Sequence, residues 1–223
     1  MLVLPACQFI SKIDKAADLE EVSESDGLPK GTNPPSKRLP NPYLANPIEV
    51  PIEAQARFQS ATEAFSTNQW QQAEQDLLWI TEHYSELSGP WLNLALLYDK
   101  MSHDKTLDDK TLDDKTNGPD KVEYAFSRAI ETNNQNVYAY NQYGVFLRKQ
   151  GDFAKAEKNY KQALVVWPDF PEGHLNLAIL YDLYLGKLTL ALHHYESYQA
   201  LQDEPKRQVS GWIIDVRRRL KTQ

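Results

Sequence analysis

The sequence predicts an all-α protein built from antiparallel helix pairs. A nine-residue phrase occurs twice, and apolar residues recur every three or four positions around both copies. Residues 91–99 read WLNLALLYD, and residues 174–182 read HLNLAILYD. The copies start 83 residues apart (174 − 91), which is two repeats of 34 and a surplus of 15. A period near 34 residues is typical of stacked helix pairs, in which each pair buries its apolar face against its neighbours.

The clearest repeat spans residues 137–170. Its apolar and small residues follow a helical rhythm in two halves, and Gly151-Asp152 separates the halves. These residues are Tyr140, Tyr143, Gly144, Leu147, Phe153, Ala156, Tyr160 and Ala163, with Pro168 at the end. Gly144 and Ala156 are small where the two helices would cross, so we expect the backbones to approach closely there.

This order and spacing of residues resembles the tetratricopeptide repeat family. The resemblance covers roughly residues 52–203 and implies about four helix pairs wound into a right-handed superhelix, an α-solenoid. It weakens away from the third pair, and the first, from about Ala54, is the most degenerate. The fourth pair has a turn that we expect to be one residue longer, because Gly186 follows Gly151 by 35 residues.

A helix at 204–223 would close the array, because a terminal pair needs a cap with one polar side. Its apolar face comprises Trp212, Ile213, Val216 and Leu220, and its basic face Arg217, Arg218, Arg219 and Lys221. The alternative interpretation of this basic run is a contact with nucleic acid or lipid.

Composition limits the classes of function. The 223 residues fit one ordered domain and a tail. The net charge of −7 argues against a nucleic-acid partner, because phosphate binding needs a basic face. The longest apolar run is shorter than the ~20 residues of a membrane span. The single cysteine excludes an internal disulfide.

Residues 1–51 are predicted to be a disordered, proline-rich tail. Seven of the 13 prolines lie between Pro29 and Pro51, and proline disfavours helix in the residue before it. Within this tail, Leu4-Pro5-Ala6-Cys7 resembles the cleavage box of bacterial lipoproteins.

That second resemblance implies lipidation of Cys7 and, with Gln8 after it, the periplasmic face of the outer membrane. It also implies further residues upstream, since only six precede Cys7 and a signal peptide needs more. The alternative is a chance cysteine near a disordered terminus, in a cytoplasmic protein.

A loop insertion is predicted at 102–119, between the helices of the second pair, because DKTLD repeats in tandem there. Calcium is disfavoured, since lysines interrupt the carboxylates and the loop lacks a late Glu. His193-His194 near Glu196 does not have the spacing of a zinc site either. The other acidic residues are expected on solvent faces. We expect no metal, no cofactor and no enzymatic activity, with an unrecognised enzyme as the remaining alternative.

The resemblance to tetratricopeptide repeats implies a concave groove lined by the first helix of each pair. The implied partner-binding residues are Phe58, Leu92, Asn93, Leu96, Tyr138, Asn141, Gln142, Val145, Arg148, Leu175, Asn176 and Ile179, with Thr62, Phe65, Asp99, Glu172 and Asp182 beside them. Asn93, Asn141 and Asn176 are the sharpest candidates, because an amide can pair with an extended peptide through its donor and its acceptor. In the alternative, these amides bond within the array.

Together these features favour a protein–protein interaction adaptor that binds a partner protein or peptide segment in this groove. By analogy with small lipoproteins of this layout, the partner would belong to a bacterial envelope complex such as a pilus, secretion or cell-wall machine. The alternative is a cytoplasmic adaptor or chaperone without a lipid anchor. The sequence assigns neither the partner nor an oligomeric state.

Overall fold

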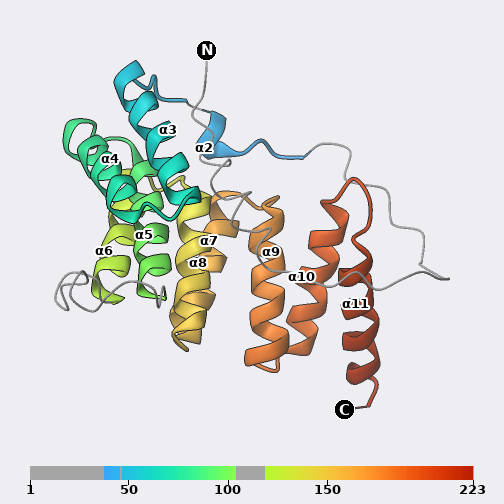
Figure 1. The fold of residues 1–223 in the computed structure, drawn as a ribbon. Coiled ribbons are helices and arrows are strands. Elements are labelled where there is room, and N and C mark those ends of the chain that lie inside the picture. Colours follow the sequence, from blue (N-terminus) through green and yellow to red (C-terminus); the bar gives the residue numbers. More distant parts are fainter. Residues whose placement is uncertain (1–37, 46, 104–118, 223) are drawn as a thin grey trace. The chain divides into compact units, whose positions relative to one another are not determined.

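A computed structural model gives the fold of residues 38–45, 47–103 and 119–222 (Figure 1). Every regular element in these ranges is a helix, which confirms the all-α prediction. The positions 1–37 and 104–118, which hold Cys7 and most of the predicted insertion, lie outside the described residues. None of the described helices is long and apolar enough to cross a bilayer.

The chain divides into two compact units, which we describe separately. Within the described residues, the first unit comprises 47–139 and the second comprises 38–45 and 140–222. The first unit holds α3 (Ile52–Ser66), α4 (Trp70–His83), α5 (Ser88–Ser102) and α6 (Pro119–Thr132). The second holds α2 (Pro42–Ala45), most of α7 (Val137–Lys149), α8 (Phe153–Val166), α9 (Pro171–Ile179), the π-helical turn η2 (Leu180–Tyr184), α10 (Leu188–Ala200) and α11 (Arg207–Leu220).

Small residues bring paired helices together in both units. Ala54 and Ala73 are fully buried in the α3–α4 pair. Gly144 of α7 faces Tyr160 of α8 so closely that an added Cβ would lie 2.6 Å from Tyr160 Cε1. Tyr160 is itself 0% exposed, and it fills the space beside the glycine. The close approach predicted at Gly144 is therefore present.

The turn after α7 has the geometry that its sequence predicts. Gly151 has a φ of +83°, a left-handed conformation that favours glycine. The carboxylate of Asp152 then caps α8 by accepting a hydrogen bond of 3.1 Å from the backbone N–H of Lys155.

The extra residue of the fourth pair is in a helix and not in the turn, so the prediction of a longer turn was wrong. The backbone N–H of Leu185 donates to the carbonyl of Leu180, five residues earlier, at 3.1 Å. This is the hydrogen bond of a π-helix, which accommodates one extra residue in a helical turn. Gly186, at φ +62°, ends the segment as Gly151 does in the previous pair.

Two carboxylates are buried, although acidic residues were expected on solvent faces. Asp76 of α4 is only 3% exposed, and its oxygens accept three hydrogen bonds. The donors are Arg57 Nη1 at 3.0 Å, Ser60 Oγ at 2.7 Å and Gln72 Nε2 at 2.8 Å. Asp76 is buried because these partners replace its hydration. The second case, Asp182, lies in the other unit.

Part of the proline-rich stretch forms specific contacts with the second unit. The backbone N–H of Leu39 donates to Asp169 Oδ2 at 2.6 Å, and its carbonyl accepts from Trp167 Nε1 at 2.8 Å. Arg38 pairs with Asp203 at 2.8 Å. Residues 38–40 thus contact the α8–α9 and α10–α11 loops, although they lie within the predicted tail.

Candidate partner-binding face

The predicted groove residues of the first unit are mostly buried. Phe58, Leu92, Asn93 and Leu96 are between 1% and 9% exposed, whereas Tyr138 and the flanking Thr62, Phe65 and Asp99 are half-buried. The side-chain amide of Asn93 donates to the carbonyl of Gly89 in its own helix at 2.9 Å. Such buried side chains have almost no surface to offer a partner, so this unit contributes little to a binding face.

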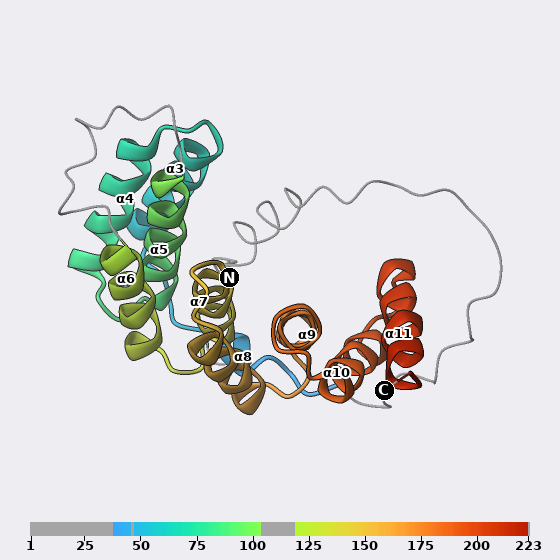
Figure 2. The same ribbon diagram turned by 90° about the horizontal axis from the view of Figure 1, so that it is seen from below.

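In the second unit, most of the predicted residues are half-buried and lie on the first helices of their pairs. Figure 2 shows α7, α9 and α11 along one side of this unit, with α8 and α10 on the other. We call the set on α7 and α9 the α7–α9 face. Its members are Gln142, Val145, Arg148, Leu175, Asn176 and Ile179.

An amide pair joins the two helices of this face. Asn176 Nδ2 donates to Asn141 Oδ1 at 3.0 Å. Asn141 is 3% exposed, so its side chain is used within the protein, whereas Asn176 is half-buried. One of the three asparagines therefore keeps accessible surface, and the other two have the internal role that the alternative interpretation assigned to them.

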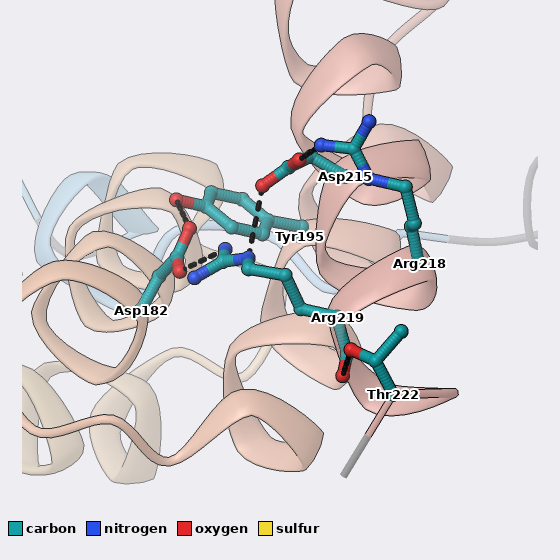
Figure 3. A network of polar contacts seen from close by, with 6 residues as sticks. All are labelled: Asp182, Tyr195, Asp215, Arg218, Arg219 and Thr222. Atoms are coloured by element: carbon teal, nitrogen blue, oxygen red, sulfur yellow. Dashed lines mark hydrogen bonds and ion pairs between the residues drawn. The ribbon is translucent and has the colours of Figure 1, made fainter.

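A network of charges closes one end of the second unit (Figure 3). Asp182 of η2 has a side chain that is only 5% exposed. It pairs with Arg219 of α11 and accepts a hydrogen bond from Tyr195 Oη at 3.3 Å. Arg219 also lies 2.9 Å from Asp215 Oδ2, through its Nε. Asp182, which the resemblance placed beside the groove, is therefore used to hold α11.

Two histidines of α9 and α10 form a second internal contact. His174 Nδ1 and His194 Nδ1 are 2.9 Å apart, and His174 Nε2 lies 2.9 Å from the carbonyl oxygen of Pro168. Since Nε2 must donate to that carbonyl, we assign Nδ1 of His174 as the acceptor from His194. Burial and the nearby His174 and His193 lower the pKa of His194 to about 4, so the pair is neutral near pH 7.

Nothing in the described ranges points to a metal centre. No three His, Cys, Asp or Glu side chains converge there as a metal site needs. In the Asp182 network the carboxylates are already paired with arginines. The histidine pair supplies only two potential metal ligands. The arrangement is suited to holding helices together and to presenting a mixed apolar and amide surface.

Sequence spacing could not show the Asp182–Arg219 contact, because its partners are 37 residues apart and helix α10 lies between their elements. The only available signal was a lone Asp at the end of the second copy of the repeated phrase. The exposed side chains of Leu183 and Tyr184 were not among the predicted groove residues.

The helix pairs, the glycine turns and the small residues at the crossings define a helix-pair repeat protein. Two family models match: one described as TPR repeat over residues 144–183, and one described as tetratricopeptide repeat over residues 125–158. Residues 125–183 therefore match tetratricopeptide repeat models. A search of curated proteins found no match.

Solved structures share this fold. The structure of PilF from Pseudomonas aeruginosa is 17% identical, covers 76% of this chain and 70% of its own, and has a TM-score of 0.61. A thermophilic TPR protein of Thermus thermophilus is 23% identical over 76% of this chain and 80% of its own, with a TM-score of 0.52. A structure of MamA (AMB-1) is 14% identical over 76% and 84%, with a TM-score of 0.54. Proteins built from these repeats generally act as adaptors that bind protein or peptide partners.

Proposed function

We propose that this protein is an adaptor whose α7–α9 face binds an extended segment of a partner protein. The observation that carries the proposal is the exposure pattern. Phe58, Leu92, Asn93 and Leu96 of the first unit are buried, whereas the six members of the α7–α9 face keep accessible surface. They lie on helices that the Asn141–Asn176 pair holds side by side.

The chemistry of the face fits a polypeptide. Val145, Leu175 and Ile179 supply apolar area, which stabilises a bound segment by roughly 25 cal/mol per Å² removed from water. Gln142 and Asn176 supply amides that can donate to backbone carbonyls and accept from backbone N–H groups.

Site-specific photocrosslinking in the native host tests this proposal. A photoreactive residue at Gln142 or Ile179 should yield a discrete adduct with a partner polypeptide. The same residue at Lys158 or Gln162, exposed on α8, is the matched control and should yield none. Equal adducts at all four positions, or adducts at the α8 positions alone, would exclude the α7–α9 face.

We further propose that the adaptor works in a bacterial envelope complex, such as pilus, secretion or cell-wall machinery, and is tethered by a lipid on Cys7. The support is the box Leu4-Pro5-Ala6-Cys7 and the proline-rich stretch between it and the repeats. Two or three acyl chains on Cys7 would anchor the chain firmly, whereas one chain binds only marginally.

Metabolic labelling with a fatty acid analogue tests the tether, with expression from the complete gene. Label should enter the wild type and be lost in Cys7→Ser, with globomycin blocking the processing. Unlabelled protein in the soluble fraction would remove the envelope proposal and leave the adaptor function as it stands.

A further inference from the structure

The α8–α9 loop of the second unit binds one residue of the proline-rich stretch through both of its backbone polar groups. Asp169 Oδ2 accepts from the N–H of Leu39 at 2.6 Å, and Trp167 Nε1 donates to the carbonyl of Leu39 at 2.8 Å. Leu39 is itself 52% exposed, so the loop binds its backbone more than its side chain. Main-chain hydrogen bonds supply affinity in the same way where proteins bind extended peptides.

The residues on either side of Leu39 add specificity. The guanidinium of Arg38 pairs with Asp203 of the α10–α11 loop at 2.8 Å. Pro40 disfavours helix at Leu39, so the N–H and carbonyl of that residue can be bound by another part of the protein. The side chain of Asn41 then caps α2, which ends the extended segment at Pro40. The bound unit therefore has a basic residue, a residue held through its backbone, and a proline.

The loop is preformed by contacts that do not involve residues 38–40. The backbone N–H of Trp167 donates to the carbonyl of Ala163 at 2.9 Å, and that of Phe170 donates to the carbonyl of Trp167 at 3.1 Å. The indole of Trp167 stacks on the buried ring of Phe170, with the ring centres 5.4 Å apart. We expect the indole N–H to stay in place when the segment leaves, and a preorganised site binds more tightly.

The contacts of residues 38–40 are of a kind that can exchange. Both hydrogen bonds lie at the surface, and the side chain of Asp203 is 93% exposed in its pair with Arg38. Such contacts contribute little, because water competes for the same groups. Connection along one chain supplies an effective concentration of roughly 1 mM, so a separate peptide near that concentration can compete. Figures 1 and 2 show this segment as the blue stretch before α2, passing the loop ends of the helices in its unit.

From these observations we infer that Trp167, Asp169 and Asp203 form a recognition site for an extended segment, and that residues 38–40 are its built-in ligand. The segment that fits has a basic residue, a second residue bound through its backbone, and a proline. The site shares no residue with the α7–α9 face. Residues 38–40 close it, and another segment with the same three features binds only by displacing them.

A peptide titrated into the full chain tests the site. Arg38→Glu/Leu39→Pro disables the built-in ligand, because it reverses a charge of the ion pair and removes the N–H that Asp169 binds. The probe is N-acetyl-Arg-Leu-Pro-Asn-Pro-Tyr-amide, which has the sequence of residues 38–43. The indole N–H signal of Trp167, assigned by its loss in Trp167→Phe, is followed by NMR.

The indole signal should shift in the double variant and return towards its wild-type position as the peptide binds, since the bond to a carbonyl forms again. The peptide should also bind the double variant at least about fivefold more tightly than the wild type, in which the built-in ligand competes. A signal that stays displaced with the peptide at ~5 mM would overturn the site. Equal affinity for both chains would overturn the built-in ligand.

Matched peptides test the specificity in the double variant. Alanine in place of the arginine should weaken binding about threefold, and N-methylation of the leucine, which removes only its N–H, about fivefold. The reversed sequence Tyr-Pro-Asn-Pro-Leu-Arg has the same composition and should leave the indole signal unchanged. Equal binding of the reversed peptide would overturn the inference, because it would show only general attraction to a basic, proline-rich chain.

A double-mutant cycle assigns the contact of Asp169. Asp169→Ala should weaken the probe as much as N-methylation does, and both changes together should weaken it no further. Glu204→Ala, beside Asp203, is the control and should bind as the parent does. Additive losses would show that Asp169 does not bind this N–H and would overturn the site. Crosslinking at Gln142 concerns the α7–α9 face, so either proposal can fail without the other.

Discussion

Gly144 of α7 has no room for a larger side chain. A Cβ there would lie 2.6 Å and 2.7 Å from two atoms of Tyr160, and Tyr160 has no room to move because it is fully buried. Gly211 in α11 offers a contrast, since an added Cβ there meets nothing within 4 Å.

Gly144→Ala should lower the free energy of unfolding by about 1–3 kcal/mol, because overpacking forces the helices apart. Urea denaturation followed by circular dichroism measures this. Gly211→Ala is the control and should raise stability by roughly 0.5–1 kcal/mol, because alanine favours a helix more than glycine does. Two variants that are equally stable would show that the approach of α7 to α8 is not tight.

Individual asparagines show how far single residues can be interpreted from sequence. Asn93 and Asn176 hold corresponding positions, Asn141 lies one position earlier in its own repeat, and all three were groove candidates. In the structure Asn93 bonds to Gly89, Asn141 accepts from Asn176, and only Asn176 keeps accessible surface. The repeat position predicts on which helix a residue lies, but its neighbours decide whether a partner can reach it.

Among the elements, the segment before α3 was the least predictable. Proline content predicted a disordered tail up to residue 51, and this was wrong for Pro42–Ala45, which form the short helix α2. It also did not show that residues 38–39 contact the second unit. Both backbone polar groups of Leu39 are bound by side chains of the α8–α9 loop, and α2 follows directly. The partners, Trp167 and Asp169, are about 130 residues away in sequence.

Limited trypsin digestion tests this contact at the Arg38–Leu39 bond. The double variant Trp167→Phe/Asp169→Ala removes both hydrogen bonds and should speed cleavage of that bond about 30-fold, since each is worth ~1 kcal/mol. Glu204→Ala, an exposed residue beside Asp203, is the control and should cleave at the wild-type rate. An unchanged rate in the double variant would show that residues 38–40 are not held by these bonds.

For the π-helical turn, the sequence predicted an extra residue but not where it lies. The 35-residue spacing between Gly151 and Gly186 revealed an extra residue, and this count was right. Its location was not, because a helix can wind the surplus into an i to i+5 bond without lengthening the turn. Leu183 and Tyr184 are exposed on this turn.

For the whole molecule, the net charge of −7 hides an uneven distribution. Residues 140–223 carry 12 Lys and Arg against 9 Asp and Glu, a net charge of +3, so residues 1–139 carry −10 (−7 − 3). The net charge of the whole chain, −7, disfavours a nucleic-acid partner. The distribution shows that the excess negative charge lies in residues 1–139.

The stability of the molecule should fall as the pH is lowered from about 6.5 to about 4. Burial lowers the folded-state pKa of His194 to about 4, and burial also lowers that of His174. In this window the unfolded chain binds more protons than the folded chain, so protonation favours unfolding. Thermal melts across this pH range measure the loss.

His194→Gln should flatten that decline between about pH 6.5 and 5, while His103→Gln, on an exposed side chain, should not. Below about pH 4.5 a further loss follows from Glu157. Burial raises the pKa of that carboxyl, but hydrogen bonds from Lys161, Lys187 and Tyr181 outweigh it and lower the pKa to about 2. A melting temperature independent of pH down to about 4.5 would contradict the neutral histidine pair.

The sequence by itself determined the helix pairs, their order and their glycine turns, because apolar periodicity and left-handed turn residues act over a few neighbouring positions. It also determined that small residues mark the helix crossings. Only the tertiary structure decided which candidate residues are accessible, where the extra residue of the fourth pair is wound, and which carboxylates are paired. Those outcomes depend on contacts between residues that are far apart in sequence, such as Asp182 with Arg219 and Leu39 with Trp167. The sequence pattern reports only on near neighbours, so it could not predict these contacts.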